Sequence, residues 1–417
     1  MTRLVRTVSA FAALALAASA SAQQEVRIGV IYPLTGAAAS TGLELKNAAQ
    51  LAADLINGND KSLALPLAGA GGIPNLKGAK IRLIFADHQG NPQVGATEAE
   101  RLIAEEKVVA LQGAYFSTVT TTASQVAERN GVPFLNADSS SPALTQRGFK
   151  WFFRTTPHDE LFVQNAFEFL RDLGKKKGIQ VKRIAILAEN TEFGTLAARL
   201  QEKGARENGY EVVEKVLYPP KGTQLTSEVQ KLKASRPDVV MQSSYLGDAI
   251  LSMKTYKDLG FQPAAILAND AGFNDSEFLK TMGKDGNFVI SREVWALDLA
   301  AQKPIIAKAN ALLQARHGVN FNGNSARAFT GIFALADALN RAGSTRPEAI
   351  QKALRETNLS GAQLIMPWSG IQFDENGQNT KGAGIIVQVQ DGKYATVWPF
   401  ALAPKDVVWP MPGWDKR

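Results

Sequence analysis

Two hydroxyl-rich loops carry the residues of this chain best suited to bind a small molecule. The first loop, Ser117–Thr122, follows the apolar run Val108–Leu111, and the second, Asp138–Ser141, follows the apolar run Val132–Leu135. A helical segment lies between them and ends before Gly131, the residue type that commonly follows a helix. This β-α-β unit predicts both loops at the carboxyl edge of a parallel sheet, where open α/β folds bind ligands.

The start of the helix after the first loop suits an anion. Ser117 or Thr118 is expected to cap this helix, and the free N–H groups of its first turn favour a carboxylate. Serine and threonine also cap helices and close turns in many proteins that bind nothing there. Both interpretations remain open from these residues alone.

Residues typical of catalysis or metal binding are sparse. The three histidines lie in separate segments without ligand spacing: His88, His158 and His317. No nucleophile elbow, zinc-protease motif or Walker loop occurs, and the glycine cluster Gly69–Gly72 lacks the preceding strand of a phosphate loop. We therefore expect a binding protein rather than an enzyme, with no cofactor and no metal.

The amino end predicts export. Arg3 and Arg6 precede the apolar run Val8–Ala18 and the small residues Ala20-Ser21-Ala22, which is the pattern of a signal peptide cleaved after residue 22. No later stretch of the 417 residues is apolar enough to span a bilayer, so a soluble periplasmic protein is expected. The formal charge of +7 is spread over mixed-sign segments and predicts no nucleic-acid partner.

Two series of alternating strands and helices make up most of the chain. The first runs from the strand Val26–Tyr32 through the two loops described above. The second has four strands, expected at Ile184–Ala188, Val212–Leu217, Val239–Ser243 and Ala265–Ala268. Such alternation predicts two α/β lobes with parallel, doubly wound sheets. An Asp-Gly pair, Asp391-Gly392, predicts a hairpin near the carboxyl end.

Several segments, in order and at consistent spacing, resemble the periplasmic solute-binding proteins of ABC importers, in the branched-chain amino acid class. They are VRIGVIYPLTG, Gly72-Ile73-Pro74 with LKGAKIRLIFADHQGNP, PALTQRGFKWFFRTTP, RIAILAENTEFG and GTQLTSEVQKLKASRPDVV. The resemblance covers essentially residues 25–400. It implies the type I periplasmic binding protein fold, a Venus-flytrap of two lobes joined by three crossovers and closed by a hinge.

The resemblance also implies a division of the chain and a set of partners. The crossovers are expected near Pro157, Arg292 and Ile365, so that residues 23–156 plus 293–364 form lobe I and residues 157–292 plus 365–417 form lobe II. The expected partners are a small-molecule ligand and an ABC transporter membrane permease. The protein itself is expected to be a monomer.

Seven positions match ligand-binding positions of the family. Ser117 matches the serine that meets the ligand carboxylate, and Asp138 and Ser140 match the loop that holds carboxylate and ammonium. Thr41 stands where the family often has an aromatic residue. In lobe II, Phe193 and Tyr245 match aromatic clamps, and Asp270 matches the acid that pairs with the amino group, which favours a cationic or strongly donating ligand.

Three departures leave the exact ligand open. Asp138 replaces a small residue and would repel a plain α-carboxylate unless it points away. Phe193 lacks a phenolic hydroxyl, and the insertion between Asp60 and Leu76 is long. The expected ligand is an amino acid of the branched-chain type. The alternatives are another small ligand, such as an aromatic acid, an amide or a nitrogen heterocycle, and a secreted enzyme or a sensor without transport.

Overall fold

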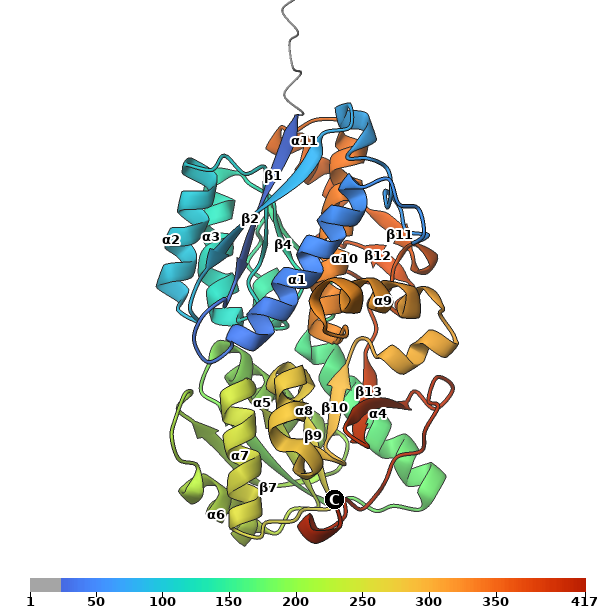
Figure 1. Ribbon diagram of the computed structural model, residues 1–417. Helices are drawn as coiled ribbons and strands as arrows, with labels where there is room; N and C mark the ends of the chain where they lie inside the picture. Colours follow the sequence, from blue (N-terminus) through green and yellow to red (C-terminus); the bar gives the residue numbers. More distant parts are fainter. Residues whose placement is uncertain (1–23) are drawn as a thin grey trace, which may run out of the picture.

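The computed structural model describes residues 24–417, so the predicted signal peptide, residues 1–22, lies outside the described residues. Within the described part, no helix combines the length and apolar character needed to cross a bilayer. Two twisted sheets lie one above the other, each at the centre of its own lobe (Figure 1).

The first lobe is built on five parallel strands in the order β2-β1-β3-β4-β5. They are β1 (Glu25–Tyr32), β2 (Lys80–Asp87), β3 (Ala110–Gly113), β4 (Phe134–Asn136) and β5 (Phe152–Arg154). Because helices cover both faces, the central strands are nearly continuous apolar runs instead of alternating ones.

Helices on the two faces of this sheet form separate cores. One face packs against α2 (Pro92–Ala104) and α3 (Ser117–Asn130), and the other against α1 (Ala39–Asn57) and α10 (Gly323–Ala342) (Figure 1). The remaining elements of this lobe are α9 (Ile305–His317), α11 (Pro347–Arg355) and the short pair β11 (Asn358–Ser360) and β12 (Gly370–Gln372). The long insertion packs on the core instead of lying on the surface, since Leu63 and Ile73 are buried.

The second lobe has seven strands in the order β14-β13-β10-β9-β8-β6-β7. They are β6 (Arg183–Glu189), β7 (Glu211–Tyr218), β8 (Val239–Ser243), β9 (Ala265–Ala268), β10 (Ile290–Glu293), β13 (Ile385–Gln390) and β14 (Lys393–Trp398). The helices α4 (Asp159–Lys177) and α5 (Glu192–Glu207) pack in one core, and α6 (Thr226–Ser235), α7 (Leu246–Asp258) and α8 (Ser276–Met282) in the other.

The predicted carboxyl-terminal hairpin is present. Strands β13 and β14 pair antiparallel, and Asp391 and Gly392 between them have φ angles of 53° and 69°, as a type I′ turn requires. Asn91 caps α2 in the first lobe, since its side chain accepts from the N–H groups of Gln93 and Val94.

The chain passes between the two sheets three times. It leaves the first sheet after Arg154, returns after Glu293, and enters the second sheet again at Ile385. The first and third passages are joined by buried hydrogen bonds, including Arg154 Nε to Gln378 Oε1 at 2.6 Å. Ile365 packs in the core of the first lobe. The lobe boundaries expected from the sequence stay predictions, and these contacts favour a third crossover between residues 373 and 384.

Candidate functional site

Six of the seven predicted site residues line one small cavity between the lobes. Its walls are Tyr115, Ser117, Asp138, Ser140, Phe193, Tyr245, Asp270, Ala271, Arg292 and Arg327. The cavity volume is about 20 Å³, which is room for about one water molecule. The two lobes are therefore closed on each other, and a ligand of amino-acid size needs them to separate or needs wall side chains to move.

Ser117 stands at the start of α3 with its hydroxyl uncommitted. The N-cap position is occupied by Phe116 and no side chain caps the helix, so the expectation that Ser117 or Thr118 caps it is wrong. The Ser117 side chain is buried, and its Oγ has no hydrogen-bond partner among the described residues. Together with the free N–H groups of the first helical turn, this hydroxyl forms a donor end for an acceptor or an anion.

The second predicted loop is held by Asn136. Its Oδ1 accepts from the N–H groups of Asp138 and Ser139 at 3.0 and 2.8 Å, which closes a turn at the end of β4. Tyr32 donates to Asp138 Oδ2 at 3.2 Å. The other carboxylate oxygen, Oδ1, has no hydrogen-bond partner among the described residues and lies 3.8 Å from Arg327 Nε. Asp138 thus offers one buried acceptor to the cavity.

Asp270 already has two cationic partners. Its Oδ2 lies 2.7 Å from Arg292 Nη1 and 2.9 Å from Arg327 Nη1, and all three side chains are buried. Arg292 belongs to β10 of the second lobe, whereas Arg327 belongs to α10 of the first, so Asp270 bridges the lobes. The charge of Asp270 therefore needs no cationic ligand, which removes the reason for which one was expected.

The arginine pair also sets the protonation of the neighbouring acids. Burial alone would raise the pKa of Asp270, but Arg327 and Arg292 together hold it below its ordinary value. Burial raises the pKa of Asp138 to about 7, although Arg327 opposes this shift. At neutral pH the cavity thus holds two guanidinium groups, one firmly ionised carboxylate and one carboxyl near its titration point. Such a site tolerates an added negative charge.

Aromatic rings from both lobes close one side of the cavity. The ring of Tyr245, at the start of α7, lies 4.2 Å from the ring of Phe116 and 5.4 Å from that of Tyr115, both of the first lobe. Phe193, at the start of α5, lies 5.3 Å from Tyr245. The predicted clamp residues are therefore neighbours, and they contact aromatic residues that the sequence did not single out.

Thr41 lies apart from this cavity. It sits inside α1, which begins at Ala39. Its Oγ1 donates instead to Asp275, at the start of α8 in the second lobe. Thr41 therefore joins the lobes and does not line the cavity.

Four residues of the cavity were missed by sequence reasoning: Tyr115, Ala271, Arg292 and Arg327. Tyr115 precedes the predicted loop by two residues and belongs to the same strand-to-helix connection, so its position alone is a usable signal. Arg292 was placed at a crossover without a role in binding. Arg327 lies in the first turns of the long helix α10, and its position there gives no indication of the acids that reach it from other segments.

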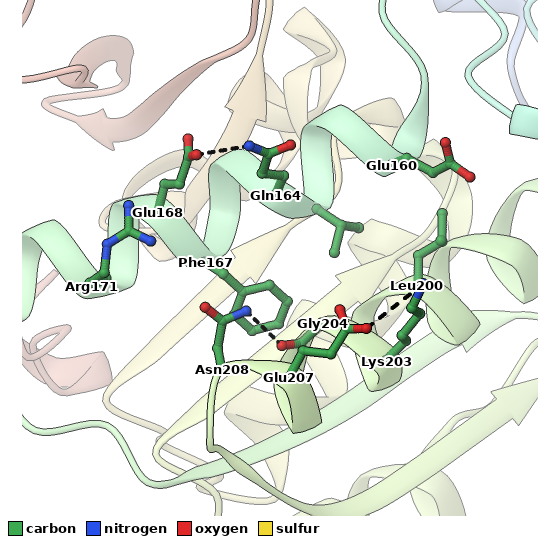
Figure 2. Close-up of a pocket in the computed structure, with 11 residues that line it drawn as sticks. Glu160, Gln164, Phe167, Glu168, Arg171, Leu200, Lys203, Gly204, Glu207 and Asn208 are labelled. Atoms are coloured by element: carbon green, nitrogen blue, oxygen red, sulfur yellow. Dashed lines mark hydrogen bonds and ion pairs between the residues drawn. The ribbon is translucent and has the colours of Figure 1, made fainter.

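A larger groove on the second lobe does not share these properties. It lies between α4 and α5, with Phe167 and Gly204 at its floor and charged side chains at its rims (Figure 2). Polar side chains pair within each rim, for example Gln164 with Glu168 of α4 at 2.9 Å and Lys203 with Glu207 of α5 at 3.8 Å. Only the second lobe contributes to it. We therefore assign the candidate site to the cavity between the lobes.

Comparisons with known proteins agree with this architecture. The model of the family described as "Periplasmic binding protein" matches residues 25–393. The Leu/Ile/Val-binding protein homolog 8 of Brucella suis is 30% identical over 406 residues, covering 96% of each chain.

Solved structures share the fold. A branched-chain amino acid transporter substrate-binding protein from Streptococcus pneumoniae, in complex with isoleucine, has a TM-score of 0.73 at 20% identity and covers 93% of this chain and 100% of its own. A solute-binding protein of an ABC transporter from Rhodopseudomonas palustris, in complex with 3,4-dihydroxybenzoic acid, also has a TM-score of 0.73 at 20% identity, covering 89% and 95%.

Proposed function

The chain belongs to the periplasmic binding protein family and has a substrate-binding role, and we propose that it captures a small carboxylate between its lobes. The first candidate ligand is an amino acid of the branched-chain type. The observation that supports this proposal best is a set of polar atoms without hydrogen-bond partners around one cavity between the lobes. Within residues 24–417, the donors Ser117 Oγ, Tyr115 Oη and Arg327 Nε and the acceptor Asp138 Oδ1 have no hydrogen-bond partner. The donors suit a carboxylate, and the acceptor suits an ammonium group.

Hinge closure explains how such a ligand is held. Ser117, Asp138 and Arg327 belong to the first lobe, whereas Phe193, Tyr245 and Asp270 belong to the second. A ligand that contacts both sets is bound fully only in the closed form. Its binding stabilises that form by the difference between its affinities for the closed and open forms. The chain then presents one closed surface to a membrane permease, which we propose as its partner.

A second candidate ligand is an aromatic carboxylic acid. Two observations favour it: four aromatic rings gather on one side of the cavity, and Arg292 and Arg327 bring two guanidinium groups to it. The structural neighbour from Rhodopseudomonas palustris binds 3,4-dihydroxybenzoic acid, and that from Streptococcus pneumoniae binds isoleucine. An aromatic acid uses the arginines and the rings, but it leaves Asp138 without a partner unless it carries a hydroxyl donor.

Calorimetric titration separates the two candidates. Protein that has been unfolded and refolded to release bound molecules is titrated with leucine, isoleucine and valine, and with benzoate and 3,4-dihydroxybenzoate. Tight binding of the amino acids, weakened on Ser117→Ala, supports the first candidate. Tight binding of the aromatic acids alone supports the second. Turnover of any of these compounds would contradict a purely binding role.

The location of the mature protein is part of the same proposal. Export with cleavage after Ala22 leaves a protein that begins near Gln23 and acts in the periplasm as a monomer. Amino-terminal sequencing of periplasmic material should start at Gln23, and light scattering should give the mass of one chain. A sequence that still begins at Met1 would contradict cleavage.

A further inference from the structure

A second and larger cavity lies between the lobes, with a volume of about 620 Å³. The second lobe contributes residues near the start of α8 and the turn between β13 and β14, and the first lobe contributes the loop between α9 and α10. The segment that follows β10 joins these parts. No wall residue is shared with the candidate site described above. The two cavities are therefore separate spaces with different walls.

The inner wall of this second cavity presents acceptors. The Nδ2 of Asn274 donates to Asp270, to the carbonyl of Arg292 and to Glu293, at 2.8, 2.8 and 2.6 Å, so its Oδ1 is left without a partner among the described residues. Glu293 lies beside it, and a Cβ on Gly323 would fall 1.3 Å from Glu293 Oε1. Glycine at position 323 is therefore required for this carboxyl to occupy the wall.

Glu293 has no close cation. No lysine, arginine or histidine nitrogen of residues 24–417 makes an ion pair with it. Burial, followed by the charge of Asp270, raises the pKa of Glu293 to about 8, even though Arg327 and Arg292 oppose the shift. A buried carboxyl in this state gains from any cation that reaches it, because the cation supplies the missing counter-charge.

Further acids stand behind the same wall. Tyr394 lines the cavity, and after burial its pKa is raised by four carboxyl groups, those of Asp275, Glu293, Glu44 and Asp270. Lys393 is the basic residue of the lining, and it is exposed at the margin. The interior therefore disfavours an anion and favours a positive charge.

The other walls are aromatic and aliphatic. Trp295 and Phe321 are buried and lie with ring centroids 5.9 Å apart, and Tyr394 faces the same space. Leu279 from α8 and Val319 from the loop complete the apolar lining. Aromatic faces attract cations through their quadrupole and also bury hydrocarbon. A bare metal ion does not suit these walls, because one carboxylate and one amide oxygen leave most of its coordination unfilled.

We propose that this second cavity binds an organic ammonium ion with an apolar body, its N–H groups on Glu293 and Asn274 and its hydrocarbon against Trp295, Phe321 and Tyr394. Because both lobes form the walls, the bound cation favours the closed form. This inference does not depend on which ligand occupies the candidate site.

The test uses 2-phenylethylammonium as the probe, with 2-phenylethanol as its neutral analogue and 3-phenylpropionate as its anionic analogue. Each is titrated by calorimetry against the mature full-length protein, with tryptophan fluorescence as a second signal from Trp295. We expect the ammonium ion to bind at least tenfold more tightly than the alcohol. Because the candidate site accepts carboxylates, binding of the anion is compared between the unmodified protein and Leu279→Trp, and we expect no difference between them.

Two variants locate the site and one controls for surface effects. Glu293→Gln removes the charge and should weaken the ammonium ion at least tenfold, while Leu279→Trp fills the cavity with the carboxyl intact and should abolish binding. Leu217→Trp makes the same exchange at an exposed leucine of β7 and should change nothing. Equal affinity for the ammonium ion and the alcohol, absence of ammonium binding, or full affinity in Leu279→Trp would overturn the proposal. The affinity of Leu279→Trp tests the proposal even where Glu293→Gln fails to fold.

Discussion

Arg327 is the residue that most changes the interpretation of the cleft. A guanidinium group is costly to bury and is retained where acids surround it, and here it contacts Asp270 and lies near Asp138. Arg327 also reaches from the first lobe to an acid of the second. Asp270 is therefore already neutralised by arginines of the protein, and it does not depend on a cationic ligand for its counter-charge.

Asp270→Asn tests this interpretation without any ligand. The exchange keeps the shape but leaves Arg292 and Arg327 without their shared counter-ion, so we expect a loss of unfolding free energy of about 3–5 kcal/mol. The measurement is denaturant unfolding of the ligand-free protein. Asp337→Asn, at a surface pair with Arg341, is the matched control and should cost less than about 1 kcal/mol. Unchanged stability of Asp270→Asn would show that its carboxylate does not hold the arginines.

Ser117→Ala is expected to have the opposite pattern. Its hydroxyl has no partner among the described residues, so removing it leaves no donor or acceptor unpaired and should change stability by less than about 0.5 kcal/mol. Affinity for a carboxylate ligand should fall by about 1.5–3 kcal/mol, the usual value of one hydrogen bond to a charged group. Thermal melting and calorimetric titration check the two parts separately. A destabilised variant with normal affinity would make Ser117 a structural residue.

At the scale of elements, periodicity predicted most helices and strands because helices on both faces of a parallel sheet impose strong apolar stripes. The strand β8 and the helix α10 show this well: one is a run of buried residues and the other a wide apolar face. The errors arose where tertiary contacts decide. Thr41 was expected beside the ligand, yet its hydroxyl binds Asp275, which lies far along the chain.

The same distinction applies to the candidate site. Loop residues at strand ends, such as Ser117 and Asp138, were predictable because topology brings those ends together. Arg327 was not, because its partners come from three other segments and no local pattern marks them. Phe193 and Tyr245 were placed by family resemblance, and their contacts with Tyr115 and Phe116 require the closed arrangement of both lobes.

The starts of α5 and α7 carry the aromatic clamp, and Tyr245→Ala tests it. Tyr245 contacts aromatic rings of both lobes, so its loss should weaken ligand binding by about 1–3 kcal/mol, as for an aromatic anchor. The open form keeps its folding, since the ring is only half-buried even in the closed form. Tyr210→Ala, which removes a ring stacked on Phe167 outside the cleft, is the control and should leave affinity unchanged. Normal affinity with a collapsed melting temperature would assign Tyr245 to the core.

At the scale of the whole molecule, closure brings acids of opposite lobes together. Glu44 of α1 accepts from Ser276 of the second lobe, and Asp275 accepts from Ser40 and Thr41 of the first. Burial, followed by the charge of Asp275, raises the pKa of Glu44 from 4.5 to about 8. Burial likewise raises the pKa of Asp275. The interface between the lobes is therefore most stable when these carboxyl groups carry a proton.

This arrangement gives the closed form a pH dependence with a definite sign. A carboxyl group whose pKa is raised on closure stabilises the closed form fully below its unperturbed value, and this contribution is lost as pH rises through the raised value. For Glu44 the window runs from 4.5 to about 8. We expect the ligand-free protein to be more open at pH 8 than at pH 5.5, which small-angle scattering measures as a larger radius of gyration. Glu44→Gln keeps the hydrogen bonds to Ser276 and Asn322 in neutral form, so its radius should change less over the same range. Because Glu277 adds a smaller repulsion and remains in the variant, Glu277→Gln is the control and should behave as the unmodified protein does. An opening of equal size in Glu44→Gln and in the unmodified protein would exclude Glu44 as its cause.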